Sequence, residues 1–478
     1  MPHILAFDEG TTSARTVLYD ETGERLLMRS IPLTSSYPSP GWVEQDAEEI
    51  WSAQLRSALT VLAESNVAPS AIGVTNQRET TIVWDRKTGR PLAPAIVWQC
   101  RRTADACRKI DAGLVARKTG LIPDAYFSAT KIQWILEHSS EARAMANDGE
   151  ALFGTVDTWL IWKLTNGAVH VTDKTNASRT MLMDLATAEW DAELLNYFDI
   201  PRAMLPRIVD SCEVVGTTAG EHLGREIPIA GIAGDQQAAL AGQACFRAGL
   251  TKNTYGTGCF ALMHTGQKVP VSQNRLLATA AADGYAVEGS IFVAGAAVQW
   301  LRDKLGLLAT SAESEALARS VPDTGGVYVV PAFVGLGAPH WKADARGLIT
   351  GLTLGTTRAH LVRATLEAIA YQTRELVDAM QADSGARLAE LRVDGGAAQN
   401  EFLMQFQADI LGCRIVRPVD TETTALGAAY LAGLATGIWK NTEEVEQFWR
   451  AEKVFEPQMT VDQREDLFAG WKRAVARV

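Results

Sequence analysis

The segment FDEGTTSAR, residues 7–15, places the strongest constraint on how this chain folds. It overlaps or adjoins two apolar runs, Ile4–Phe7 and Thr16–Tyr19, that are typical of β-strands. The segment therefore predicts a β-hairpin with a turn of glycine and small hydroxyl residues. The glycine lets other groups approach the backbone closely. The N–H groups and hydroxyls of residues 11–13 can donate to phosphate oxygens, and Asp8 can hold Mg²⁺ directly or through water.

A similar turn, YGTGCF at Tyr255–Phe260, lies about half a chain later and also between apolar segments. Taken alone, each turn is equally consistent with a capped β-hairpin, because Asp-x-Gly-Thr is common in turns. One such hairpin in each half instead predicts a nucleotide held between two related domains.

Composition and charge exclude several classes of protein. The chain has 478 residues, a length that suggests roughly three domains and fits two large ones as well. Of these residues, 47% are hydrophobic and 21% charged, which is ordinary for a globular protein. A net charge of −11 without a basic patch argues against a nucleic-acid partner or an anionic membrane. The six scattered cysteines have neither CxxC nor zinc spacing and indicate reduced core thiols. We see no signal peptide and no membrane span, and therefore expect a cytoplasmic protein.

Strand and helix signals alternate in both halves, which indicates the α/β class. Asp46 is expected to cap a helix with apolar residues at helical spacing from Ile50 to Leu62. The run Ile227–Ala233 predicts a buried strand that leads into a helix at Gly234-Asp235. The polar stretch Arg247–Asn253 is the expected boundary, with a first domain over 1–246, a hinge or linker over 247–253 and a second domain over 254–478. Other expected helices cover Arg101–Ile110, Thr130–His138, Arg358–Asp383, Glu401–Leu411, Thr424–Gly437 and Arg464–Val478.

The common nucleotide motifs are absent from the sequence. No glycine is followed by lysine, which excludes a P-loop, and GxGxxG after a strand is also missing. An adenosine site is instead predicted at VDGGAAQN, Val393–Asn400, where two glycines end a strand and can lie against a flat base or a phosphate. Asn400 opens the next helix and can bond to a purine or ribose. A glycine-rich turn with an asparagine cap explains the motif equally well.

An acceptor site is predicted at NQRETT, residues 76–81. In a regular strand, Arg78 and Glu79 would point to opposite faces, whereas a bulge or strand end lets both line a cleft. A small polyol needs such a donor and acceptor pair, because each hydroxyl both donates and accepts. Aromatic rings can cover its C–H edges, and Trp98 and Phe260 are candidates, although either can equally be core.

GDQQAAL, Gly234–Leu240, contains the strongest catalytic candidate. Asp235 is expected at a strand end and helix start, where helix N–H groups favour an ionised carboxylate. A helix cap is the simpler role, and the two roles are compatible. A carboxylate beside an alcohol can orient it and accept its proton during phosphoryl transfer, a reaction that depends mainly on positioning. Gln236 is then an amide close to the substrate.

Almost the whole chain resembles the FGGY carbohydrate kinase family. Two segments are similar to the family signatures, YFSATKIQWILEH (Tyr126–His138) and GLITGLTLGTTRAHLVRATLE (Gly347–Glu367). Other segments resemble the members that phosphorylate glycerol, namely PGWVEQD, NQRETTIVW, AIVWQCRRT, FGTVDTWLIWKLT, TNASRTML and GIAGDQQAAL.

The resemblance implies two actin-like ATPase domains of ribonuclease-H type around a central cleft that closes on substrate. The first domain would bind glycerol and phosphate, and the second would bind adenosine. The implied reaction converts glycerol and MgATP to sn-glycerol 3-phosphate and ADP, in glycerol catabolism, with ATP and Mg²⁺ as cofactors. We also expect a homo-oligomer, either a dimer or a tetramer.

Site residues follow from the same resemblance. Asp235 would be the general base, and Asp8 is the candidate metal ligand. The residues implied to contact glycerol are Arg78, Glu79, Trp98, Tyr126, Asp235, Gln236 and Phe260. Those implied to bind ATP are Thr11, Thr12, Ser13, Arg15, Thr257, Gly295, Gln299, Gly396 and Asn400.

The chain departs from the family at two places. Glu9 stands where the family usually has glutamine, so that it either alters metal affinity or points away from the site. The segment Thr217–Glu226 matches neither regulatory form of the family's loop. One form binds fructose 1,6-bisphosphate through an arginine where this chain has Glu226, and the other carries a phosphorylated histidine one position from His222. We expect no inhibition by this sugar bisphosphate and interpret His222 as an exposed loop residue.

Two other functions compete with glycerol phosphorylation. A relative acting on another polyol or ketose is disfavoured by the Arg78-Glu79 pair together with Trp98 and Tyr126. An actin-like nucleotide-driven binding protein, similar to the heat-shock chaperone ATPase, would leave Asp235 and the Arg78-Glu79 pair unexplained. ADP production measured with and without glycerol separates all three.

Overall fold

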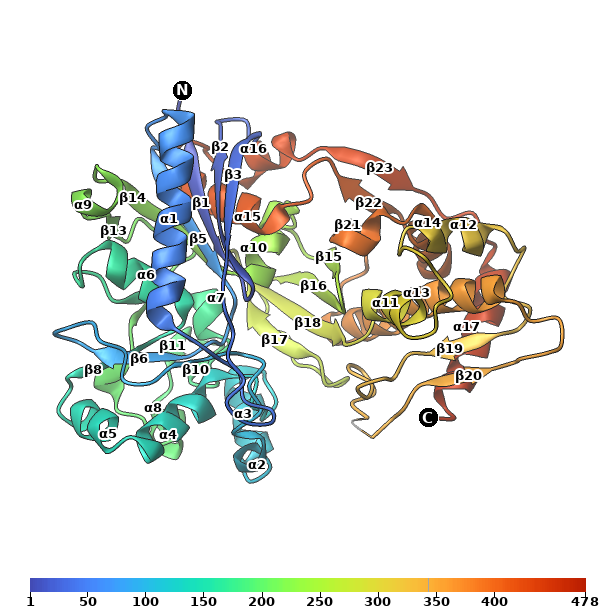
Figure 1. Cartoon of the computed structure of the whole chain (residues 1–478), viewed down its shortest axis with the longest axis horizontal. Coiled ribbons are helices and arrows are strands. Elements are labelled where there is room, and N and C mark those ends of the chain that lie inside the picture. Colours follow the sequence, from blue (N-terminus) through green and yellow to red (C-terminus); the bar gives the residue numbers. More distant parts are fainter. Residues whose placement is uncertain (343) are drawn as a thin grey trace.

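Two mixed β-sheets, one in each lobe of the molecule, organise the chain (Figure 1). The computed structural model describes residues 1–342 and 344–478. In the first sheet, β1 pairs parallel with β5, which pairs parallel with β14, while β1, β2 and β3 form an antiparallel meander. In sheet order these strands are β13 (Gly216–Thr217), β14 (Pro228–Gly234), β5 (Ala71–Asn76), β1 (Ile4–Glu9), β2 (Ser13–Tyr19) and β3 (Arg25–Pro32).

The second sheet repeats this arrangement. Its antiparallel strands β15, β16 and β18 correspond to β1, β2 and β3, and the parallel strands β21 and β22 correspond to β5 and β14. The predicted echo of the two hairpins is thus part of a repeated topology. The strands in order are β17 (Leu277–Ala280), β18 (Tyr285–Ile291), β16 (Cys259–Gly266), β15 (Leu250–Tyr255), β21 (Glu390–Asp394), β22 (Ile415–Pro418) and β23 (Ala451–Phe455).

Helices cover both faces of the first sheet (Figure 1). On one face, α1 (Ala47–Ser65) and α6 (Val156–Leu164) pack with alternate side chains of β1. As predicted, the Asp46 side chain caps α1 by accepting from the Glu48 N–H. The other face is covered by α10 (Asp235–Gly242) and by α15 (Thr423–Ala435). The cover of the first sheet therefore includes a helix from near the end of the chain.

The second sheet packs against the long helix α13 (Arg358–Ser384), together with α14 (Glu401–Leu411) and α17 (Val461–Val475). The expected helices at these three places are confirmed to within a few residues. Two shorter helices, α11 (Gly295–Asp303) and α12 (Glu313–Arg319), contribute to the same core.

A further core fills the lower part of the first lobe in Figure 1. It is built from α3 (Ala112–Thr119), α4 (Ser128–His138), α5 (Ser140–Asn147) and α8 (Ala192–Tyr197). The edge strand β17 of the second sheet also packs into this core. The remaining helices are α2 (Ala104–Cys107), α7 (Lys174–Ala177), α9 (Gly220–Leu223) and α16 (Thr442–Phe448), with 3₁₀ turns at Arg202–Met204 and Gly396–Gln399.

Short two-stranded pairings complete the fold. They are β4 (Glu44–Gln45) with β7 (Ala95–Ile96), β6 (Ile82–Asp85) with β8 (Ala151–Gly154), β12 (Arg207–Val209) with β9 (Val171–Asp173), β10 (Met183–Asp184) with β11 (Glu189–Trp190), and β19 (Tyr328–Val330) with β20 (Leu348–Thr350). Among the described residues, no helix is long and apolar enough to cross a membrane.

Two sequence predictions differ from the structure. The helix expected over Arg101–Ile110 is reduced to the single turn α2. The polar stretch Arg247–Asn253 is largely not a linker, because β15 begins at Leu250 and pairs on both sides within the second sheet. The predicted division of the chain at this stretch stays a prediction, and the change from one sheet to the other spans α10.

Candidate functional site

The first hairpin turn is open at the positions predicted to meet phosphate. The Gly10 N–H donates to the Ser13 carbonyl at 3.0 Å and closes the turn between β1 and β2. Gln45 Nε2 holds the Thr11 carbonyl at 2.6 Å from outside the hairpin. Thr12 is exposed, and Thr11 and Ser13 are half-buried, so these side chains lie at the surface rather than in the core.

Arg15 links this hairpin to the chain's distant second half. Its Nη2 lies 3.0 Å from Asp8 Oδ2, and its Nη1 donates to Glu422 Oε2 at 2.8 Å. Burial raises the pKa of Asp8 to about 6, against the opposing charge of Arg15. Asp8 is therefore a buried carboxylate beside the turn, and Glu422, directly before α15, is a partner that sequence reasoning missed.

Glu9 points to the other face of the sheet. Side chains alternate along a strand, which places Glu9 with Leu5 and Phe7 on the α1 and α6 face. Its side chain is fully buried, and its two carboxylate oxygens have no hydrogen-bond partner among the described residues. Burial, reinforced by the charge of Asp8, raises the pKa of Glu9 well above its usual value.

Arg78 and Glu79 follow the end of β5, as the acceptor-site prediction requires. Glu79 has a φ of 61°, in the left-handed region that non-glycine residues rarely adopt. This turn ends the regular alternation of the strand, so both side chains can enter the same network. Both are buried, at 2% and 1% exposure.

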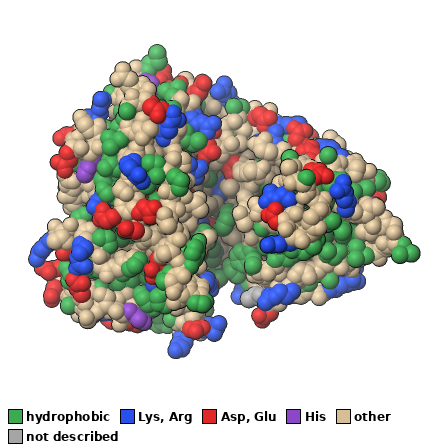
Figure 2. All heavy atoms as spheres, in the orientation of Figure 1, with side chains coloured by type: hydrophobic (Ala, Val, Ile, Leu, Met, Phe, Trp, Pro, Cys, Tyr) green, Lys and Arg blue, Asp and Glu red, His purple; other side chains and the backbone are tan. Residues whose placement is uncertain are grey.

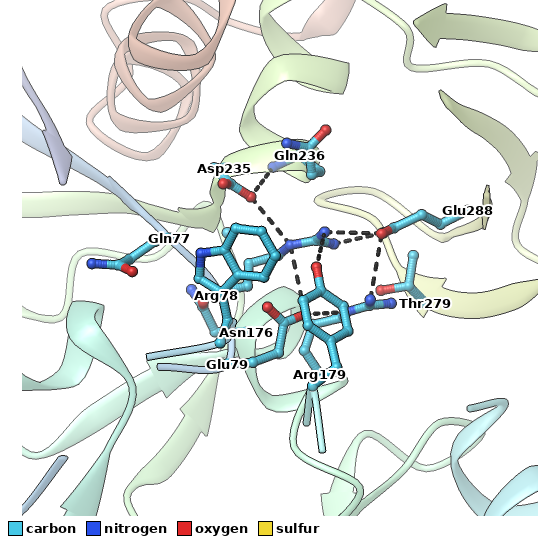
Figure 3. A network of polar contacts seen from close by, with 12 residues as sticks. Gln77, Arg78, Glu79, Asn176, Arg179, Asp235, Gln236, Thr279 and Glu288 are labelled. Atoms are coloured by element: carbon cyan, nitrogen blue, oxygen red, sulfur yellow. Dashed lines mark hydrogen bonds and ion pairs between the residues drawn. The ribbon is translucent and has the colours of Figure 1, made fainter. Parts of the chain in front are cut away.

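Figure 3 shows the charged network that these two residues join. Arg78 donates from Nη1 and Nη2 to the two oxygens of Glu288, at 2.6 and 2.9 Å. Its Nε lies 3.1 Å from Asp235 Oδ1. Arg179 donates from Nε to Glu79 Oε1 at 2.8 Å and from Nη2 to Glu288 Oε1 at 3.4 Å. Negative and positive side chains thus alternate through the network.

Asp235 is the partly exposed member of this network. It is the first residue of α10, directly after β14, and the preceding Gly234 is the helix cap in place of the aspartate. Its Oδ1 accepts from the Gln236 N–H at 2.7 Å, and about a third of its side chain (32%) is exposed. Burial raises the pKa of Asp235, while Arg78 and Lys252 act against that shift.

Lys252, from the stretch first interpreted as a linker, faces the same site. It is fully buried, and its Nζ donates to Gln236 Oε1 and, at 3.1 Å, to Thr254 Oγ1. Burial lowers the pKa of Lys252, against the charges of Asp394, Glu288 and Asp235.

Aromatic residues lie between the hairpin and the charged network. Trp98 Nε1 donates to Thr11 Oγ1 at 2.9 Å, and the Trp98 ring meets Tyr126 edge-to-face at 5.6 Å. Arg78 Nη2 donates to the Tyr126 hydroxyl at 3.3 Å. Phe260 lies on β16, opposite Ser290 of β18, and none of the ring contacts found in the described part of the chain joins it to Trp98 or Tyr126.

A pocket of about 460 Å³ lies in the second half of the molecule and collects the remaining predicted nucleotide residues. The second hairpin turn forms one wall, where the N–H groups of Ala294 and Ala296 donate to the Thr257 carbonyl at 2.9 and 3.0 Å. The predicted residues that line the pocket are Thr257, Gly295, Gln299, Gly396 and Asn400. Sequence reasoning missed other lining residues, including Ser311, Ser314, Glu315, Leu366, Ile369 and Leu403.

The two glycines at the end of β21 have different structural roles. Gly395 has a φ of 85°, and a Cβ there would lie 2.6 Å from the Tyr255 carbonyl oxygen. A Cβ on Gly396 would meet no protein atom within 4 Å. Asn400 caps α14 by accepting from the Leu403 N–H at 2.9 Å, and it also donates to Ser314 Oγ at 3.2 Å. The predicted capping role of Asn400 is therefore real, and it is compatible with a place in the pocket wall.

Three residues of the charged network were not predicted as site residues, namely Glu288, Arg179 and Lys252. Glu288 and Arg179 are charged residues within otherwise apolar or small-residue stretches, whereas Lys252 lies in a polar stretch. Fully buried charges are normally paired, so such positions do carry a signal. Their partners lie far away along the chain, however, and the sequence alone does not identify them.

In the segment Thr217–Glu226, the surroundings of His222 differ from the prediction. His222, interpreted as an exposed loop residue, is half-buried in α9. Its Nε2 lies 2.8 Å from Asn166 Oδ1, and its ring meets Trp51 edge-to-face at 5.1 Å. Packing against α1 therefore fixes this side chain. The absence of regulation stays a prediction.

The two parts of the site are linked by contacts between the lobes. Figure 2 shows the surface recessed between the two lobes. The first hairpin and Asp235 are close enough for the charge of Asp235 to raise the pKa of Asp8. On the other side, β15 carries Lys252 toward Asp235 and leads directly into the pocket wall at Tyr255.

Comparisons with known proteins cover nearly the whole chain. The model of the N-terminal domain of the FGGY family of carbohydrate kinases matches residues 3–242, and the model of its C-terminal domain matches residues 251–436. The chain is 56% identical to glycerol kinase 2 of Thermotoga maritima, over 100% of this chain and 99% of the relative. It is 57% identical to a glycerol kinase of Carboxydothermus hydrogenoformans, over 99% and 98% of the two chains.

A solved structure agrees with the two-domain α/β fold. The structure of Plasmodium falciparum glycerol kinase with ADP superimposes with a TM-score of 0.96 and 39% identity, over 100% of this chain and 98% of that one. The fold class predicted from the sequence is confirmed.

Proposed function

Because the chain belongs to the FGGY family of carbohydrate kinases, we propose that it transfers a phosphoryl group from ATP to glycerol, giving sn-glycerol 3-phosphate and ADP. The observation that carries this proposal is Asp235, a partly exposed carboxylate beside the buried Arg78. The relatives named glycerol kinase support the choice of acceptor. A role in glycerol catabolism and assembly into a dimer or tetramer stay predictions.

Asp235 acts as the general base. One hydroxyl oxygen of glycerol attacks the γ-phosphorus of ATP while the bond from that phosphorus to the ADP oxygen breaks. The hydroxyl proton passes to Asp235. A loose transition state requires little base strength at the start, so the main task of Asp235 is to hold the alcohol in line. Lys252 and Arg78 favour its ionised form against the effect of burial.

The acceptor binds where hydrogen-bonding and aromatic groups meet. Arg78 and Glu79 supply a donor and an acceptor, Gln236 adds an amide, and Tyr126, Trp98 and Phe260 flank the carbon chain. The four N–H groups on the terminal nitrogens of Arg78 already have protein acceptors. Its Nε, beside Asp235, is therefore the nitrogen best placed to meet a hydroxyl.

ATP spans the two halves of the chain. Thr11, Thr12, Ser13 and Arg15 hold its phosphates from the first hairpin, while Thr257 holds them from the second. Gly295, Gln299, Gly396 and Asn400 enclose the adenosine in the pocket. The solved relative that contains ADP supports nucleotide binding by this fold.

Asp8 is the residue proposed to hold Mg²⁺. The ion usually keeps several waters and takes one or two carboxylates together with substrate phosphates, so a single buried carboxylate beside the phosphate turn fits it. The described residues contain no group of three or more ligands that would form a metal site without ATP. When bound, Mg²⁺ would neutralise charge on the phosphates. Asp8 would hold the ion, and Arg15 would orient the Asp8 carboxylate.

The decisive experiment measures ADP production by the purified protein with MgATP, in the presence and absence of glycerol. Glycerol should stimulate ADP production strongly, and a panel of other polyols and ketoses should stimulate it less. Stimulation by a ketose in place of glycerol would assign a different acceptor. Production of ADP at the same rate without any acceptor would instead favour a nucleotide-driven binding protein.

Asp235→Asn tests the base directly. We expect kcat to fall roughly 10²–10⁴-fold, the usual contribution of a positioned acid or base. Binding of ADP, followed by calorimetry, should stay unchanged because the nucleotide pocket is separate from Asp235. Activity within a few-fold of the unmodified protein would remove Asp235 from the catalytic role.

A further inference from the structure

Glu288 joins the two buried arginines of the charged network, Arg78 and Arg179 (Figure 3). Ion pairs join Asp235 to Arg78, Arg78 to Glu288, Glu288 to Arg179 and Arg179 to Glu79. Glu288 is 1% exposed. Arg78 Nε also lies 3.8 Å from Glu79 Oε1. The ion pairs therefore close into a ring, to which Asp235 is attached through Arg78.

Glu288 also fixes the orientation of Arg78. Its two carboxylate oxygens accept from both terminal nitrogens of the guanidinium, the planar two-point geometry that holds an arginine most firmly. The remaining two N–H groups of these nitrogens donate to Gln237 Oε1 and the Tyr126 hydroxyl, both at 3.3 Å. With these four bonds made, Nε lies 3.1 Å from Asp235 Oδ1.

This carboxylate comes from the opposite half of the chain. Glu288 lies on β18, and the neighbouring β17 is bound to the first lobe through Thr279. Gln237 Nε2 donates to Thr279 Oγ1 at 2.8 Å, and Ser178 Oγ lies 3.0 Å from the same oxygen. The β17–β18 edge of the second sheet is thus built into the acceptor side of the site.

Glu288 is charged under all ordinary conditions. Burial acts to raise the pKa of Glu288, but Arg179 and Arg78 outweigh it and lower the pKa to about 2. Its negative charge offsets two buried guanidinium groups, which would otherwise repel each other across the site.

We propose that Glu288 is a positioning residue for the acceptor alcohol, acting through Arg78 and Arg179 and without touching the substrate. The inference rests on the proposed function. It means that the second half of the chain contributes to acceptor recognition as well as to nucleotide binding.

Glu288→Gln tests this role because the amide keeps the shape of the side chain but loses the charge and one acceptor oxygen. We expect the KM for glycerol to rise at least about 10-fold, the loss typical of a charge-assisted hydrogen bond. The KM for ATP should stay within about two-fold, since the nucleotide pocket lies apart from this network. An unchanged KM for glycerol would overturn the proposal.

The matched control is Glu367→Gln. Glu367 is also a buried glutamate of the second half, bonded to Arg363 Nε at 2.8 Å and to the Tyr371 hydroxyl at 3.3 Å. Its substitution should leave the KM for glycerol within about two-fold. If both substitutions raise this KM equally, loss of a buried charge is the cause and the positioning role fails.

A double-mutant cycle with Arg78→Ala tests the route of the effect. If Glu288 acts through Arg78, adding Glu288→Gln to Arg78→Ala should raise the KM for glycerol by less than about two-fold further, because coupled residues are not additive. Independent effects, in which the two fold-changes in KM multiply, would overturn the proposal.

Glu288→Asp is the alternative variant if Glu288→Gln fails to fold. It retains the charge but withdraws the carboxylate, and it should still raise the KM for glycerol at least about three-fold. An unchanged KM for glycerol would overturn the inference.

ADP production by the unmodified protein distinguishes a failure of the proposed function from a failure of the positioning role of Glu288. If glycerol does not stimulate its ADP production, the proposed function fails, and the variants are then compared with whichever polyol or ketose does. If no acceptor stimulates it, both proposals fail. If glycerol stimulates it and Glu288→Gln behaves as the Glu367 control does, the positioning role alone fails.

Discussion

Glu9 is a single residue whose environment conflicts with its charge. A buried carboxylate without hydrogen bonds is strongly disfavoured in its ionised form. Glu9 is fully buried on the α1 face of the sheet, and the neighbouring Asp8 adds a second negative charge. Both effects act in the same direction, so the folded protein binds a proton at Glu9 that the unfolded chain releases near pH 4.5.

The sign of the pH dependence follows. Between pH 4.5 and the higher pKa of the folded state, the folded protein holds more protons than the unfolded chain, so its stability falls as the pH rises. Glu9→Gln removes this loss. We expect the variant and the unmodified protein to be equally stable near pH 4. The variant should gain about 1.4 kcal/mol toward pH 8 for each unit by which the folded pKa exceeds 4.5.

Thermal unfolding of both proteins between pH 4 and pH 8 measures this difference. The shift of Asp8 is common to both proteins and largely cancels in the comparison. A gap in melting temperature that is constant across the range would mean that Glu9 has the same pKa in the folded and unfolded states. Its carboxylate would then have a partner that keeps it ionised.

For single residues, the local sequence predicted which residues belong to the site better than it predicted their interaction partners. The Arg78-Glu79 pair and Asp235 were predicted because strand ends and helix starts are local patterns. The φ of 61° at Glu79 supplies the break in alternation that the prediction required. Glu288 was missed, because its link to Arg78 joins residues 210 positions apart and depends on how the two sheets meet.

Among the elements, the strand-to-helix turn after β21 bears most directly on nucleotide binding. Gly395 is held in a left-handed conformation against the backbone of Tyr255, so glycine is required there for folding. Gly396 has no such requirement, since a Cβ would enter open space in the pocket. The proposed binding of a nucleotide against Gly396 would explain its lack of a side chain.

Gly396→Ala should accordingly affect binding and not folding. We expect the Kd for ADP to rise at least about 10-fold, or about 1.4 kcal/mol, because the new methyl group occupies space needed by the nucleotide. The melting temperature without nucleotide should stay within about 1 °C. A loss of about 1 kcal/mol of stability would lower the melting temperature of a domain by a few degrees. Calorimetric titration with ADP measures the first quantity and a thermal scan the second. Unchanged ADP affinity would show that the nucleotide does not approach Gly396.

Element boundaries were predictable where capping residues or long apolar periods mark them. The Asp46 cap of α1 and the full length of α13 are examples. The first residues of β15 were predicted to be a linker because Thr251, Lys252 and Asn253 form a polar run. Polar residues normally indicate a loop. Here, however, both faces of a central strand are buried, and Lys252 donates a hydrogen bond to Gln236.

For the whole molecule, the contact between α10 and α15 joins the two halves of the chain. Each helix places a glycine against the backbone of the other. A Cβ on Gly242 would lie 1.8 Å from the Thr423 carbonyl oxygen, and a Cβ on Gly427 would lie 1.8 Å from that of Ala238. The helices can therefore cross only because both side chains are absent. Gly242 is the last residue of α10, and Gly427 lies inside α15. Neither position identifies the distant partner helix from the sequence.

Gly427→Ala should separate these helices and weaken the cover of the first sheet. We expect a loss of stability at the upper end of the roughly 1–3 kcal/mol that overpacked sites cost, because the clash is with backbone that cannot rotate away. Chemical denaturation followed by circular dichroism measures it. Gly355→Ala is the control, since a Cβ there would meet only Thr353 Oγ1 at 3.7 Å. Equal stability of the two variants would mean that the crossing can widen without cost.

The return of α15 to the first sheet has a consequence for protein synthesis. The strands β1, β5 and β14 have all been synthesised once Gly234 has been made, but the helix that covers one of their faces begins at Thr423. At about 5–20 residues per second, this interval lasts on the order of ten seconds or more. Throughout it, the apolar face formed by Ile4, Ala6 and their neighbours lacks its final cover. The lobe that is translated first is therefore completed last.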